Sequence, residues 1–132
     1  MLIKKVVKKM MCVSATSDNL TASLDPGFGR CAFFIIVDPT SMQFTAIPNT
    51  GHSIVGGAGI QAAQTVANSG AKTVITGNVG PTAFRALSIA GIYLITSVSG
   101  TVRAVVEKFK NDEYKKTDVP TVSGHSSTGG NY

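Results

Sequence analysis

Short apolar runs alternate with polar, glycine-rich stretches along most of the chain. Five runs have the length and apolar character of β-strands, and they cover residues 10–16, 31–38, 42–48, 72–76 and 92–96. Three other segments carry apolar residues at helical spacing, and they cover residues 60–68, 81–90 and about 101–110. The chain is therefore predicted to follow the order β-β-β-α-β-α-β-α.

The loops between these elements predict how the strands pair. Turns join the first three strands, so these should form an antiparallel meander, and right-handed crossovers should then add the fourth and fifth strands in parallel. If the fourth strand pairs beside the first, the sheet order is 3-2-1-4-5 with only strand 2 reversed. The predicted fold class is α/β: an RNase H-like fold with a five-stranded mixed sheet flanked by three helices.

Strand direction predicts where a ligand would bind. Strands 1, 3, 4 and 5 point the same way, so the segments that follow them should gather along one edge of the sheet, called the rim below. In open α/β sheets, ligands bind at such an edge. Thr76–Pro81 is the most distinctive of these segments, because two glycines precede a proline that suits the first turn of a helix. Its N–H groups and the positive end of the helix dipole would attract an anion.

Four glycine-containing loops should deliver candidate binding residues to the rim. A cap or a turn explains any one of these glycines equally well, and their coincidence at one edge is what favours a ligand site. The candidates for anion or cofactor binding are Arg30, Gly77, Asn78, Val79, Gly80, Arg85, Ser99, Gly100, Thr101 and Arg103.

Composition and charge narrow the class of protein. The chain has 132 residues and a net charge of +5, but eight lysines near its two ends carry the excess. A solvated flank explains them better than a nucleic-acid-binding arm. No apolar run approaches the ~20 residues of a membrane span, and no signal peptide is evident. We therefore expect a cytoplasmic protein that contacts neither membrane nor nucleic acid.

Five motifs together resemble one protein family. The segments DPGFGR, FFIIVD, GGAGIQAAQ, TGNVGPTAF and SGTVRAVVEKF are similar to the dinitrogenase iron-molybdenum cofactor biosynthesis family, although Gly27 stands where the family more often has a basic residue. The resemblance implies an RNase H-like domain over residues 9–110, after an N-terminal extension at 1–8 and before a polar tail at 111–132 that we expect to be mobile. It also implies carriage of an iron–sulfur cluster or an iron-molybdenum cofactor precursor between metallocluster assembly proteins.

An iron–sulfur cargo favours thiolate or imidazole ligands. His52, in the loop after the third strand, is the best single candidate, and Cys31 at the rim is the second. A solvated loop histidine and an inward-packed thiol remain the alternatives. Cys12, inside the first strand, is predicted to be a core thiol.

The residues give little support to catalysis. A two-metal nuclease needs clustered carboxylates, and the core of this chain has few. The GxGxxA match at residues 57–62 follows a loop and lacks the acidic residue ~20 positions on that a dinucleotide site needs. We therefore predict a non-catalytic carrier. The alternative is a regulatory or scaffold module that docks a partner protein or a small anionic ligand through the rim.

Overall fold

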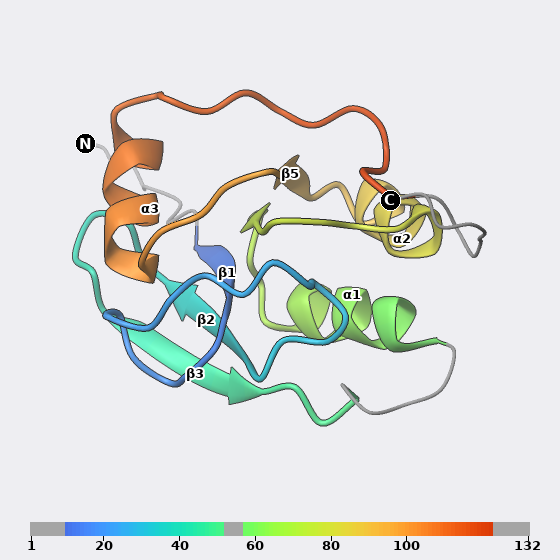
Figure 1. The fold of residues 1–132 in the computed structure, drawn as a ribbon, viewed down its shortest axis with the longest axis horizontal. Coiled ribbons are helices and arrows are strands. Elements are labelled where there is room, and N and C mark those ends of the chain that lie inside the picture. Colours follow the sequence, from blue (N-terminus) through green and yellow to red (C-terminus); the bar gives the residue numbers. More distant parts are fainter. Residues whose placement is uncertain (1–9, 52–56, 123–132) are drawn as a thin grey trace, which may run out of the picture.

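A twisted sheet lies between two layers of helices in the computed structural model, which describes residues 10–51 and 57–122 (Figure 1). The elements follow the predicted order: β1 (Met11–Ala15), β2 (Phe33–Val37), β3 (Phe44–Pro48), α1 (Ala58–Asn68), β4 (Thr73–Ile75), α2 (Pro81–Ile89), β5 (Tyr93–Ile95) and α3 (Val102–Lys110).

The sheet has the order β3-β2-β1-β4-β5. Strand β1 pairs antiparallel with β2 and parallel with β4, so it lies at the centre of the sheet. Strand β3 is antiparallel to β2, and β5 is parallel to β4. The predicted strand order, with only strand 2 reversed, is confirmed.

Each face of the sheet contributes to its own apolar core, because alternate strand residues point to opposite faces. Cys12, Phe34 and Val74 lie in the core beneath α1 and α2. Val13 and Ile75 lie in the core beneath α3, which contributes its own buried valines. Strands β1 and β4 thus pack apolar residues on both faces of the sheet, which is why each is a largely continuous apolar run in the sequence.

Several element boundaries differ from the prediction by one or two residues, and two of the differences have identifiable reasons. Strand β2 begins at Phe33 rather than at residue 31, because Asn49 takes the preceding carbonyls: its N–H donates to Ala32 O (2.9 Å) and its Nδ2 to Cys31 O (2.9 Å). Helix α1 begins at Ala58, because Gly57 adopts the left-handed conformation (φ 78°) and serves as the N-cap.

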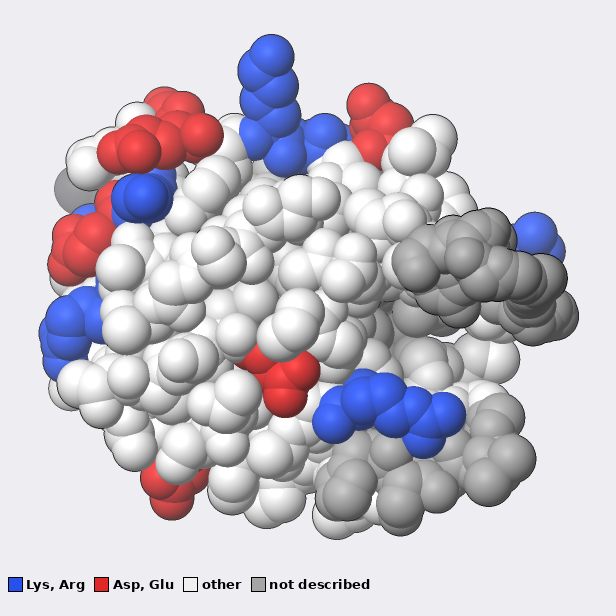
Figure 2. Space-filling model, in the orientation of Figure 1, with Lys and Arg blue, Asp and Glu red and all other residues white. Residues whose placement is uncertain are grey.

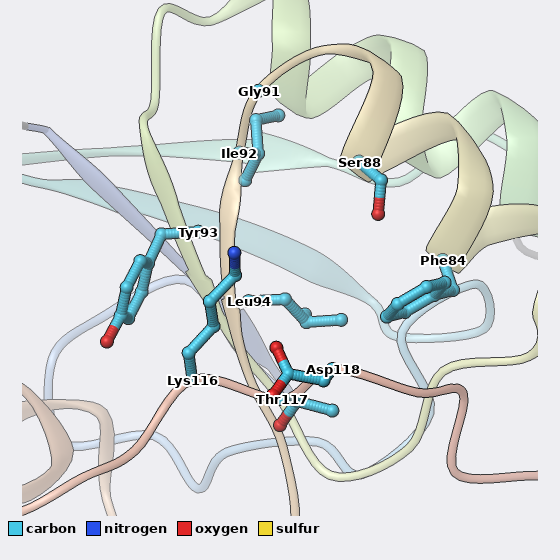
Figure 3. A pocket seen from close by; sticks show the side chains of 9 residues that line it. All are labelled: Phe84, Ser88, Gly91, Ile92, Tyr93, Leu94, Lys116, Thr117 and Asp118. Carbon is cyan, nitrogen blue, oxygen red and sulfur yellow. The ribbon is translucent and has the colours of Figure 1, made fainter.

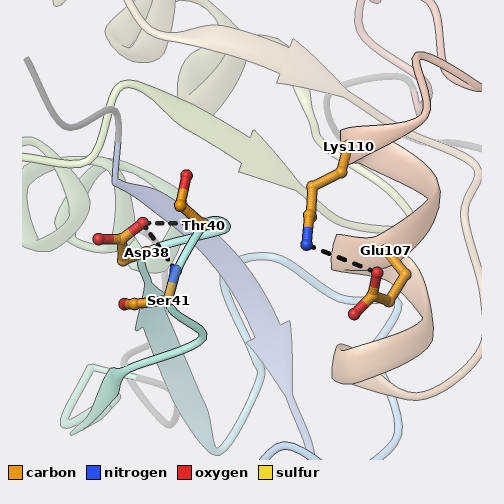
Figure 4. A network of polar contacts seen from close by, with 5 residues as sticks. All are labelled: Asp38, Thr40, Ser41, Glu107 and Lys110. Carbon is orange, nitrogen blue, oxygen red and sulfur yellow. Dashed lines mark hydrogen bonds and ion pairs between the residues drawn. The ribbon is translucent and has the colours of Figure 1, made fainter. Parts of the chain in front are cut away.

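At the edge of the sheet opposite the rim, hydrogen bonds to one carboxylate hold the turn between β2 and β3. Between β2 and β3, Asp38 Oδ1 accepts the N–H groups of Thr40 (2.9 Å) and Ser41 (3.4 Å), as Figure 4 shows. The same figure shows Lys110 paired with Glu107 one turn earlier on α3 (3.7 Å). That pair is substantially exposed and adds little stability.

Candidate functional site

The loop between β1 and β2 runs through the centre of the rim. Gly27 forms a parallel bridge with Asn78, and the Asn78 N–H donates to Pro26 O at 2.7 Å. Farther back in the loop, the Leu24 N–H donates to Gly100 O at 2.8 Å. The segments after β4 and β5 therefore both meet this first loop, as the strand directions predicted.

Glycines allow these segments to approach one another closely. A Cβ on Gly77 would lie 2.6 Å from Pro26 Cα, and a Cβ on Gly29 would lie 3.1 Å from Gly59 N. A Cβ on Gly59 would in turn lie 3.1 Å from Ala83 Cβ. At Gly77 any side chain would force the main chain to shift, and at Gly29 and Gly59 a neighbour would have to give by a few tenths of an ångström, whatever a ligand requires.

Buried polar side chains fix the first loop to the sheet. Ser14 is fully buried, and its Oγ donates to Asp25 O (2.6 Å) and shares a hydrogen bond with Thr76 Oγ1 (2.7 Å). Asn49 Nδ2 donates to Gly29 O at 3.2 Å. The sequence-based site did not include these residues. The sequence feature that could have identified them is a polar residue inside or beside a strand that is otherwise apolar.

The start of α3 is occupied by the chain itself. The Val102 N–H donates to Ala22 O and the Arg103 N–H to Leu20 O, each at 2.9 Å. Thr101 Oγ1 caps the helix by accepting the Ala104 N–H at 3.1 Å. In this structure the first-turn amides of α3 therefore hold the first loop rather than face solvent.

The amides in the loop after β4 are also partly occupied. The Asn78 N–H binds Pro26 O, and the Val79 N–H donates to Thr121 Oγ1 at 2.8 Å. In this structure the N–H groups of Asn78 and Val79, which the sequence offered to an anion, are therefore held by other parts of the chain. The partner of Val79 comes from a part of the chain that the sequence pattern assigned to the polar tail.

That partner belongs to a segment called the C-terminal strap below, residues 117–122. After α3 the chain crosses the molecule to the side of α2 (Figure 1), and the Thr117 N–H donates to Leu94 O at 2.7 Å on the way. Thr117 Oγ1 also accepts the Thr96 N–H at 3.0 Å. The strap thus crosses the ends of β5 and β4 in turn.

The starts of α1 and α2 differ from that of α3. Gly57 and Gly80 are their N-caps, and within the described residues neither start has a side-chain cap; as in α3, the first turn of each carries no acidic residue. The contact between Gly59 and Ala83 places the two helix starts side by side. Because each helix N-terminus carries a partial positive charge, two adjacent starts that no described side chain caps favour an anion.

Charged side chains are dispersed around this framework. Arg30, Arg85 and Arg103 are all exposed, on the first loop, on α2 and in the first turn of α3 respectively. On the face shown in Figure 2, most charged groups lie near the margins and the basic ones form no continuous patch. The proposed contacts of these arginines with a ligand stay predictions.

Comparison with known proteins identifies the family. Residues 9–112 match the family model described as dinitrogenase iron-molybdenum cofactor. The chain belongs to this family. It is 36% identical to the orange protein of Desulfovibrio gigas, solved in its apo form, with a TM-score of 0.85 over 89% of this chain and 100% of that one.

Two further relatives in this comparison extend the match to other organisms. An uncharacterized protein of Methanocaldococcus jannaschii is 28% identical over 85% of this chain and 97% of its own length. A candidate NifB protein from Thermotoga is 24% identical, with a TM-score of 0.73 over 86% of this chain and 99% of that one, which shows the shared fold.

Cys31, one of the two predicted metal ligands, lies in the core of this protein. Its side chain is fully buried, and Sγ is 3.5 Å from Phe28 O, to which it donates. Burial, and next the nearby Asp25 charge, raise the pKa of Cys31 to about 12. A thiolate is therefore strongly disfavoured in this conformation. Cys12 is also fully buried, which confirms the prediction of a core thiol.

The other predicted metal ligand, His52, lies outside the described residues. Within residues 10–51 and 57–122, no three or more His, Cys, Asp or Glu side chains gather in a group that could hold a metal ion. In the same residues, no helix has the length and apolar character needed to cross a membrane. Metal ligation by His52 and Cys31 stays a prediction.

Proposed function

We propose that the protein is a non-catalytic carrier that binds an anionic metallocluster, of the iron–sulfur or iron-molybdenum precursor type, at the rim. The observation that carries the proposal is the pair of adjacent, uncapped starts of α1 and α2 beside the first loop. Membership of the dinitrogenase iron-molybdenum cofactor family supports the choice of a metallocluster as the anion. Similarity to a protein described in its apo form supports a bound group.

The chemistry of the rim suits reversible binding. Helix dipoles stabilise negative charge without a covalent bond, and each is worth typically 0.3–1 kcal/mol at an exposed site. Arg30 and Arg85 would add charge, and His52 would supply a ligand atom. Cys31 would first have to leave the core, so we rank it below His52. A carrier needs this openness, because it must pass its cargo to an assembly protein in the cytoplasm.

The buried polar groups of the rim have structural partners. Ser14, Thr76 and Asn49 hold loops together through the hydrogen bonds given above. Among the described residues these contacts form no nucleophile–base pair, which fits a binding protein better than an enzyme.

Anaerobic titration with a synthetic thiolate-ligated [4Fe–4S] cluster tests the proposal. Wild type should retain iron and sulfide through gel filtration and show the visible absorption of the cluster. His52→Ala should lower the retained iron, and Lys108→Ala, near the far end of α3, should not. If neither wild type nor a variant with a weakened strap (Thr121→Val) retains cluster, the proposal is wrong. If wild type retains cluster and His52→Ala retains as much, only the ligand assignment is wrong.

The exposed apolar side chains favour the alternative of a docking module. Ile89 on α2 is 80% exposed and Val119 in the strap is 65% exposed. Copurification of a stable partner protein from the native host, with no visible chromophore, would favour a regulatory or scaffold role over the carrier.

A further inference from the structure

The strap binds the loop that the proposed function assigns to the ligand. Thr121 makes three hydrogen bonds with Val79: its Oγ1 accepts the Val79 N–H (2.8 Å), its own N–H donates to Val79 O (2.9 Å), and its Oγ1 also donates to Val79 O (3.4 Å). A Cβ on Gly80, the N-cap of α2, would lie 3.7 Å from Val122 Cγ2. The strap therefore lies directly beside one of the two uncapped helix starts.

The strap has no fully buried residue: Asp118 and Val119 are exposed and the other four are half-buried. A cavity of about 340 Å³ lies between the start of the strap and α2, and Figure 3 shows Phe84 and Ser88 of α2 lining it together with Asp118 of the strap. Val119 is 65% exposed. The hydrogen bonds of two threonines, Thr117 and Thr121, attach it to β5 and to the loop after β4. Segments with few buried apolar contacts open at a low free-energy cost.

We propose that the strap is an internal competitor for the anion site. The Thr121 hydroxyl occupies the Val79 N–H that a bound anion would otherwise take, and binding of the anion releases residues 117–122. A charged acceptor makes a stronger hydrogen bond to the same N–H than a neutral hydroxyl does, so the exchange favours the anion. The inference rests on the proposed function, because it concerns access to the same site.

Competition from the strap lowers the measured affinity of the protein for the anion. When the binding-competent state is only a fraction of the population, the measured dissociation constant rises in inverse proportion to that fraction. Weakening the strap should therefore tighten binding, whereas a substitution in a merely structural segment should leave binding unchanged or weaken it.

Three full-length variants isolate the strap. Thr121→Val keeps the shape and β-branching of the side chain but removes the hydroxyl at Val79, and Thr117→Val does the same at Thr96. Thr45→Val, on the exposed edge strand β3, is the matched control. The probe is the synthetic [4Fe–4S] cluster titrated without oxygen, with hydrogen exchange of the peptide covering residues 114–122 as a second readout.

The loss of one hydrogen bond corresponds to about a three- to tenfold change in an equilibrium constant. We expect Thr121→Val to bind the cluster about three- to tenfold more tightly than wild type, Thr117→Val to change in the same direction, and Thr45→Val to match wild type. Loading wild type should speed exchange in peptide 114–122. Cluster binding by Thr121→Val and Thr117→Val, with none by wild type, would also support the inference.

Two results would overturn the inference and leave the carrier function standing. The first is that Thr121→Val binds the cluster with the same affinity as wild type. The second is that hydrogen exchange in peptide 114–122 does not change when wild type is loaded with the cluster. If wild type and all three variants bind no cluster, both the carrier function and the competition are wrong.

Discussion

Replacing Gly77 with alanine tests whether close backbone packing holds the rim together. The new Cβ would lie 2.6 Å from Pro26 Cα and 2.9 Å from Pro26 O. These atoms belong to the main chain, so they cannot rotate away as a flexible side chain would. Either the loop after β4 or the first loop must move.

The cost follows from two terms. Overpacking a well-packed site costs typically about 1–3 kcal/mol. The same movement weakens the hydrogen bond from the Asn78 N–H to Pro26 O (2.7 Å), and such a bond contributes about 1 kcal/mol. We therefore expect Gly77→Ala to lower the free energy of unfolding by about 2–4 kcal/mol, a large fraction of the 5–15 kcal/mol typical of a domain.

Gly80→Ala is the matched control, three positions along the same loop. Its φ is −80°, and the nearest atom to a new Cβ is Val122 Cγ2 at 3.7 Å, so alanine fits. Alanine is a poorer N-cap than glycine, but it also reduces the entropy of the unfolded chain, and the net change should stay below about 1 kcal/mol. Urea unfolding followed by circular dichroism measures both variants. A loss below about 1 kcal/mol for Gly77→Ala, or an equal loss for Gly80→Ala, would refute the steric argument.

Two further predictions concern buried groups near the rim. Because burial raises the pKa of Cys31 to about 12, the unfolded chain loses this proton at lower pH than the folded one. Above about pH 8.5, stability should therefore fall by up to about 1.4 kcal/mol per pH unit from this group; equal pH slopes for wild type and Cys31→Ala in urea unfolding between pH 8 and 10 would contradict this. Ser14→Ala should cost about 1–3 kcal/mol, because it removes a partner from Asp25 O and from Thr76 Oγ1. Adding Thr76→Val should cost less than the sum of the single losses if the two hydroxyls share one bond, and strict additivity in thermal unfolding would argue against it.

The fold was predictable because apolar runs in the sequence indicate burial and the connections between strands indicate their direction. The run from Cys31 to Asp38 is apolar without alternation, as a central strand buried on both faces requires. The lack of a helix between the first three strands favoured the meander, and helices between the later strands favoured parallel crossovers. The meeting of loops at one rim followed from these directions alone.

Hydrogen-bond partners between loops were not predictable in the same way. The Val79 N–H finds its acceptor on Thr121, 42 residues later, and no hydropathy pattern marks that threonine. Residues 117–122 lack apolar periodicity, so they resemble an unattached tail, although the Thr117 and Thr121 contacts fix them to β5 and to the loop after β4. Cys31 likewise stands at the rim in sequence, but Asn49 holds its carbonyl and its thiol points into the core.

The three helix starts at the rim have separate roles under the proposed function. Thr101 caps α3, and carbonyls of the first loop accept its first amides, so this start is structural and Arg103 beside it has the weaker claim as a ligand contact. Helices α1 and α2 begin at glycines with no side-chain cap, and their starts touch through Gly59. The rim glycines bring these two positive ends together by close packing, and the proposed site then consists of the two helix ends and the adjoining Val79 N–H, which Thr121 occupies in this structure.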